Sequence, residues 1–235
     1  MVKRFATRLF FFLLGYNHKN FIKPKSTIMK KIIFSCLTLL ICLSAFSQYV
    51  AINAFGGYTF RDRINFGNAY AYINGGGIWG ASIEGVNVSG TGLELLYQYQ
   101  STNIPVYNYP GNVQQNAGND GATISYLLLN FEQYYMNNPK IEPYGGLGLG
   151  AAFYKGNFPG SVSETKFAWD IKAGVKFNIS GGLGLKIGAQ LLSSTQVTGT
   201  GFYVGYPGYV YPYNTYAYIL QFSFTGGLVY SFGGK

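Results

Sequence analysis

Residues 167–179 read Phe-Ala-Trp-Asp-Ile-Lys-Ala-Gly-Val-Lys-Phe-Asn-Ile. Every second residue of this stretch is apolar, and the residues between them are small, polar or charged. Successive side chains of a β-strand point to opposite sides, whereas a helix repeats about every 3.6 residues. The period of two therefore predicts a strand with one broad apolar face and one small or polar face.

The same alternation recurs along most of the chain. We predict eight strands, separated by turn-rich segments, at residues 49–60, 74–85, 91–101, 121–135, 142–154, 166–179, 183–195 and 216–232. The fourth of these fits least well, because Tyr126-Leu127-Leu128-Leu129 interrupts the alternation. We expect a β-bulge or a shifted register at that point.

The connections between the predicted strands alternate in length. The long ones are 61–73, 102–120, 155–165 and 196–215, and the short ones are 86–90, 136–141 and 180–182. Transmembrane barrels show this asymmetry between their two ends. A soluble lipid-carrying barrel would present a heavily charged face to water, and the polar face here carries few charges. We therefore predict an all-β chain that forms an eight-stranded antiparallel up-and-down transmembrane β-barrel.

Basic residues are concentrated at the N-terminal end. The formal net charge is +9, yet eight of the 17 Lys and Arg residues lie within residues 1–31, where no acid is present. From residue 48 onward nine basic residues stand against all eight acidic ones. A nearly neutral domain argues against nucleic acid as a partner.

Residues 29–47 have the basic, apolar and small-residue parts of a cleavable secretory signal peptide. We expect cleavage near Ser47 and Gln48, and we assign residues 48–235 to the barrel domain. An uncleaved anchor is the alternative, but the apolar run of about 15 residues is shorter than the roughly 20 that a spanning helix needs. Residues 1–28 are an upstream extension outside the fold, either an early start or an extended basic region.

Two absences limit the chemistry of the expected mature chain. Both cysteines, Cys36 and Cys42, and the single histidine, His18, precede residue 48. Disulfides, thiol nucleophiles, Ser-His-Asp sites and the usual zinc sites each require one of these residue types. We expect no catalytic residue, no metal and no cofactor, and an enzyme is the least favoured function.

Three segments carry a resemblance to a known family: Glu142-Pro-Tyr-Gly-Gly-Leu-Gly-Leu-Gly, the two strands around residues 180–182, and Gly227-Leu-Val-Tyr-Ser-Phe. With these, residues 49–232 resemble the small eight-stranded outer-membrane β-barrel proteins of Gram-negative bacteria, the OmpA/OmpX-like family. The resemblance implies a bacterial outer-membrane location and contact with its lipid. It also implies recognition by the barrel assembly machinery through Tyr230 and Phe232, although Gly233-Gly234-Lys235 follow where such chains normally end.

Seven charged residues fall on the face that we expect to line the lumen. They are Glu84, Glu94, Glu132, Asp170, Lys172, Lys176 and Lys186. Because buried charges need partners, we expect acids of the second to fourth predicted strands to pair with bases of the sixth and seventh. An eight-stranded barrel is just wide enough for side chains to fill it. We predict a lumen plugged by paired charges, and a narrow porin-like channel for small solutes or ions is the alternative.

Tyrosines gather near strand ends and in the long loops. Those near strand ends are Tyr58, Tyr97, Tyr99, Tyr144, Tyr154, Tyr218 and Tyr230. We expect them to form interfacial girdles, and the alternative for some of them is that tyrosine is simply a good strand former. Those in loops are Tyr107, Tyr109, Tyr203, Tyr206, Tyr209, Tyr211 and Tyr213. Rigid amphipathic tyrosines offer contact area at low entropy cost. We predict a structural or surface-interaction protein whose loops bind an extracellular ligand, and the alternative is that these tyrosines only cap the barrel rim.

Overall fold

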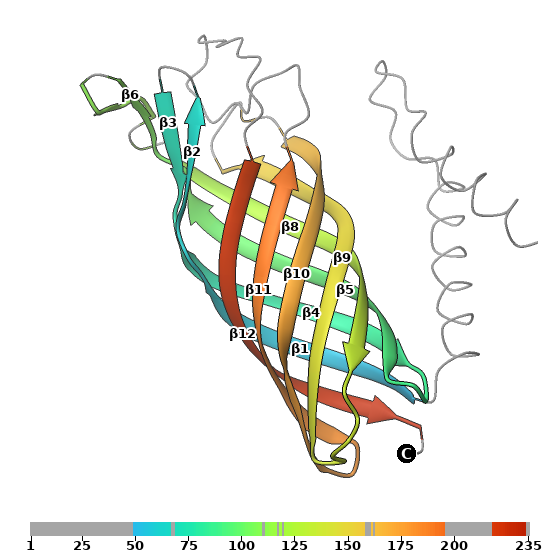
Figure 1. Cartoon of the computed structure of the whole chain (residues 1–235). Helices are drawn as coiled ribbons and strands as arrows, with labels where there is room; N and C mark the ends of the chain where they lie inside the picture. The colour runs from blue at the N-terminus through green and yellow to red at the C-terminus, as the bar shows by residue number, and fades with distance from the viewer. Residues whose placement is uncertain are drawn as a thin grey trace, which may run out of the picture. The chain divides into compact units, whose positions relative to one another are not determined.

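The computed structural model describes residues 49–66, 69–109, 111–116, 118, 120–157, 161, 163–195 and 218–233. Eight strands form a closed barrel (Figure 1), namely β1 (Tyr49–Thr59), β4 (Gly76–Val86), β5 (Thr91–Asn103), β8 (Gly121–Tyr134), β9 (Ile141–Gly156), β10 (Ser163–Ser180), β11 (Leu183–Thr195) and β12 (Tyr218–Phe232). Consecutive barrel strands are antiparallel neighbours, and β1 pairs with both β4 and β12, which closes the barrel. The predicted eight-stranded up-and-down architecture is confirmed.

The expected upstream extension, residues 1–28, and the expected signal peptide, residues 29–47, lie outside the described residues. Across the part of the chain that the structure describes, no helix is long and apolar enough to cross a membrane.

A second sheet occupies two segments that we predicted as loops. Its strands are β2 (Asp62–Phe66), β3 (Ala69–Ile73), β6 (Val106–Asn108) and β7 (Val113–Gln114), in the order β2-β3-β6-β7. The connections 61–73 and 102–120 are long, as predicted, but they contain short strands that we did not predict. These strands are only two to five residues long, and the segments between them contain the Asn, Gly and Pro residues that mark turns. Figure 1 shows β2, β3 and β6 at the end of the barrel opposite the β10–β11 turn.

The outer wall of the barrel is apolar. Large exposed side chains cover it, among them Trp79, Phe131, Leu147, Leu149, Phe167, Ile171, Phe224 and Leu228. The alternate positions point inward and are buried, as the patterns of β1, β5, β8 and β12 show. Apolar residues on the outside and closed backbone pairing are what a hydrocarbon environment requires of a β-structure.

Strand β8 keeps a regular register, contrary to our expectation. Its pairing with β5 and β9 continues without interruption through Tyr126, Leu127, Leu128 and Leu129. Leu127 and Leu129 lie on the outer wall, whereas Tyr126 and Leu128 are buried in the lumen. The alternation disappears from the sequence because this part of the lumen is itself apolar. The predicted bulge or shifted register in this strand was wrong.

Cysteine labelling tests this register. In a background with Cys36 and Cys42 changed to serine, a lipid-soluble thiol reagent should label Leu127→Cys and Leu129→Cys in the membrane-embedded protein. Leu128→Cys should react slowly under the same conditions, because Leu128 is fully buried. Equal labelling at all three positions would contradict the regular register.

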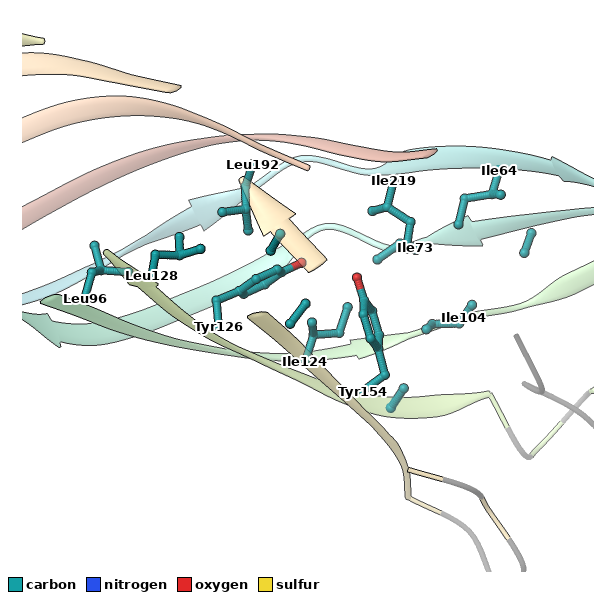
Figure 2. Close-up of a cluster of buried hydrophobic side chains, with 14 of the residues drawn as sticks. Ile64, Ile73, Leu96, Ile104, Ile124, Tyr126, Leu128, Tyr154, Leu192 and Ile219 are labelled. Carbon is teal, nitrogen blue, oxygen red and sulfur yellow. The ribbon is translucent and has the colours of Figure 1, made fainter. Parts of the chain in front are cut away.

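Two apolar clusters fill the ends of the lumen. The upper cluster contains Ile64, Ile73 and Ile104 near the second sheet, and Tyr126, Leu128 and Tyr154 inside the barrel (Figure 2). The lower cluster, near the short turns, consists of Tyr49, Ala51, Val86, Tyr134, Tyr144 and Val229, with Met136 packed against it. The upper cluster joins one face of the second sheet to the barrel, so the connections 61–73 and 102–120 pack against the barrel where the structure describes them.

Candidate functional site

The seven charged residues that we expected in the lumen are all buried in the barrel. None has more than 8% of its surface exposed, and they are Glu84, Glu94, Glu132, Asp170, Lys172, Lys176 and Lys186. They come from β4, β5, β8, β10 and β11. Three of them, Asp170, Lys172 and Lys176, lie on β10 at successive intervals of two and four positions, so their side chains leave the strand on the same side.

Two lysines and three glutamates form what we term the ionic layer: Lys172, Lys186, Glu84, Glu94 and Glu132. Lys186 Nζ lies 3.0 Å from Glu84 Oε2, 2.9 Å from Glu132 Oε2 and 3.7 Å from Glu94 Oε1. Lys172 Nζ pairs with Glu94 and lies 2.5 Å from Glu132 Oε1. Each lysine therefore bridges two or three carboxylates, and the layer is a connected network and not a set of separate pairs.

The strand register explains why the lysines must come from elsewhere in the barrel. Glu84 on β4 is directly opposite Glu94 on β5, and Glu132 lies on the next strand, β8. Carboxylates side by side repel one another. The two ammonium groups that compensate them extend from β10 and β11, which do not pair with β4 or β5. The ion pairs thus cross the lumen and join separate parts of the wall.

Aromatic rings lie directly beside the ionic layer. Tyr134 Oη lies 2.8 Å from Glu84 Oε2 and 2.7 Å from Glu132 Oε2, and its ring packs against Tyr144 with centroids 5.4 Å apart. Lys186 Nζ lies 4.5 Å from the Tyr144 centroid and 5.4 Å from that of Tyr134. An ammonium over an aromatic face is attracted by the ring quadrupole. These rings connect the ionic layer to the lower apolar cluster.

Tyr144 and Tyr154 were expected in an interfacial girdle, and that expectation was wrong. Both are buried inside the barrel. They share their parity with the small residues of β9, which face the lumen, and this pattern could have identified them. Tyr58, Tyr97 and Tyr230 lie exposed on the outer wall.

Asp170 and Glu94 each accept a hydrogen bond from an amide side chain. Gln190 Nε2 donates to Asp170 Oδ2 at 2.8 Å, and Asn130 Nδ2 donates to Glu94 Oε2 at 2.7 Å. Asn130 and Asp170 are both directly opposite Gly148, on either side of β9. A Cβ atom at Gly148 would collide with the Oδ1 atoms of both side chains. Because glycine has no side chain, position 148 leaves room for Asn130 and Asp170, which we term the polar row.

Lys176 has a different acidic partner, which sequence reasoning missed. Its Nζ lies 3.8 Å from Glu142 Oε2 and donates to Tyr49 Oη at 3.1 Å. Glu142 is 2% exposed, and its even number places it on the same face of β9 as Gly146, Gly148 and Gly150. That shared parity was the available signal for a lumen position.

The network leaves little free space. A cavity of about 20 Å³ lies beside Asn53, Glu94, Lys172 and Lys186, which is enough for about one water molecule. One carboxylate oxygen from each of Glu84, Glu94 and Glu132 lies within 4.8 Å of the other two. Lys172 and Lys186 pair with all three carboxylates, so these five residues form an ion-pair network.

The comparisons with known proteins agree with this architecture. No family model and no curated protein sequence matches the chain. It is similar to the crystal structure of Neisserial surface protein A, with a TM-score of 0.52 and 12% identity over 78% of this chain and 97% of that chain. It is also similar to the outer membrane protein OprG from Pseudomonas aeruginosa, with a TM-score of 0.54 and 12% identity over 80% of this chain and 98% of that chain. The chain has the fold of the small outer-membrane β-barrel proteins.

In this outer-membrane-type barrel the second sheet presents a tyrosine-rich face on the side away from the upper cluster. Tyr70 stacks on Tyr107 with centroids 5.2 Å apart and lies 5.1 Å from Tyr109. Tyr109, one of the predicted loop contacts, is exposed, and Tyr107 is half-buried. The other predicted contacts, Tyr203, Tyr206, Tyr209, Tyr211 and Tyr213, lie outside the described residues.

Proposed function

We propose that this protein resides in the bacterial outer membrane as a closed scaffold that carries a binding surface at its long-loop end. The fold and the apolar outer wall support this location. By analogy with other transmembrane barrels, the end with long connections faces the outside of the cell. The protein is proposed to have no enzymatic activity and no cofactor.

The filling of the lumen is the observation that carries the proposal. The ionic layer lies between an upper apolar cluster and a lower cluster of tyrosines and aliphatic residues. A water-filled channel would need polar walls and continuous space, as in larger barrels. Packed side chains at three levels instead favour a structural or surface-interaction role over a narrow porin-like channel.

Single-channel recording tests the closed lumen. The full-length protein, purified from the membrane and inserted into planar bilayers, should show no steady conductance steps. Folding is checked in the same preparation by the difference in gel mobility between unheated and heated samples. Steady steps that change on Lys172→Gln or Glu94→Gln would instead establish the porin-like alternative.

Two partners follow from the proposed location. Membrane lipid contacts the apolar outer wall. The barrel assembly machinery is proposed to recognise the last strand, where Tyr230 and Phe232 lie exposed with ring centroids 4.7 Å apart.

An extracellular ligand is proposed to bind the tyrosine-rich long-loop end, since rigid rings lose little entropy on binding. The capping role of the same rings is the alternative for this surface.

A further inference from the structure

Two exposed arginines stand against the tyrosine-rich face of the second sheet. Arg61 Cζ lies 3.6 Å from the centroid of the Tyr72 ring, and Arg63 Cζ lies 4.3 Å from that of Tyr70. Arg63 is directly opposite Tyr72 in the β2–β3 pairing. Arginine stacks on aromatic faces through its planar guanidinium and leaves its N–H edges free to bind anions. The two cations therefore belong to one ordered surface.

The contacts around the two arginines hold the side chains in place but do not neutralise their charge. Arg63 Nε donates to Asn65 Oδ1 at 3.0 Å, and Arg63 also donates to the Tyr109 hydroxyl. Asp62, which lies between the two arginines, accepts hydrogen bonds from the backbone N–H groups of Arg63 and Leu220, each at 2.8 Å. Among the described residues, every ion pair within 4.0 Å involves other cations. The pair of arginines keeps its positive charge.

The arginines adjoin the apolar outer wall. Phe60, which directly precedes Arg61, stacks on Phe222 at 5.9 Å and meets Tyr58 and Phe224 edge-on at 5.4 and 6.0 Å. All four rings are exposed. They form a continuous aromatic patch on the surface that faces acyl chains. Such aromatic patches mark the level of lipid headgroups in membrane barrels.

We propose that Arg61 and Arg63 bind the phosphate of a lipid headgroup while the acyl chains of that lipid lie against Phe60, Phe222 and Phe224. This inference rests on the proposed membrane placement, and it names lipid phosphate as a ligand of the long-loop end. A phosphate accepts the paired N–H groups of guanidinium with good geometry. The apolar patch below and the cations above match the two parts of one anionic lipid.

Native mass spectrometry of the full-length protein in neutral detergent tests the site. The probes are phosphatidylglycerol, a neutral glycolipid with the same acyl chains and no phosphate, and inorganic phosphate alone. We expect phosphatidylglycerol to bind on the order of tenfold more tightly than the neutral glycolipid. The double variant Arg61→Gln/Arg63→Gln should lose this preference, and inorganic phosphate should bind far more weakly than the lipid.

The matched control removes two exposed charges elsewhere, with Lys140→Gln/Lys155→Gln, and should keep the preference. Gel mobility of unheated samples verifies that each variant is folded. Equal binding of the two lipids by the wild type, a preference that survives in the arginine variant, or equally tight binding of inorganic phosphate would overturn the proposal. The lipid titration requires only a folded barrel in detergent. A failed lipid preference is therefore distinguishable from failure of the proposed function, which would appear as channel conductance or as a location outside the outer membrane.

Discussion

Replacing Lys186 with methionine is expected to lower the free energy of unfolding by about 3–5 kcal/mol. Lys186 lies within 4.0 Å of Glu84, Glu94 and Glu132. Methionine has a similar length but no charge, so three buried carboxylates would share only Lys172. Removing one partner of a buried ion pair leaves an uncompensated charge in a poorly solvated site. Urea unfolding in lipid vesicles, followed by the fluorescence of Trp79 and Trp169, measures the effect.

Two further variants separate charge from packing. Lys166→Met removes a lysine whose pair with Glu164 is partly exposed, and it should cost under about 1 kcal/mol. The double variant Lys186→Met/Glu84→Gln removes one charge of each sign and should recover part of the loss. If Lys186→Met were as stable as the wild type, the ionic layer would not be held by charge pairing.

The inward position of the charged residues could be predicted because it depends only on parity along each strand. Once 167–179 is a strand with an apolar outer face, Asp170, Lys172 and Lys176 must point inward. The same rule applied to β9 would have placed Glu142 and Tyr144 inside. Both share the parity of Gly146, Gly148 and Gly150, the small residues of the lumen face.

The level of each lumen side chain along the barrel axis could not be predicted from parity. Whether Lys186 meets Glu84 or Glu142 depends on the stagger of strands that are distant in sequence. The upper apolar cluster could not be predicted for a different reason. Apolar residues on the lumen face of β8 remove the alternation, so the strand pattern looks interrupted there. The second sheet was hidden because its strands are short and gain their stability from packing against the barrel mouth.

Gly148→Val is the second substitution expected to have a large effect, with a loss of about 3 kcal/mol. Gly148 lies directly between Asn130 on β8 and Asp170 on β10, and any Cβ there would collide with both. Displacing these side chains would break the hydrogen bonds from Asn130 to Glu94 and from Gln190 to Asp170. The same urea titration measures the loss.

The matched control is Gly226→Val, in the middle of β12. Nothing lies within 4 Å of a Cβ at Gly226, and valine favours strands, so its stability should change by under about 0.5 kcal/mol. Adding Asn130→Ala to Gly148→Val should relieve part of the collision, because alanine vacates the space that the new side chain needs. Equal stability of the Gly148 and Gly226 variants would show that the polar row can rearrange, and that the glycine is not required to hold it.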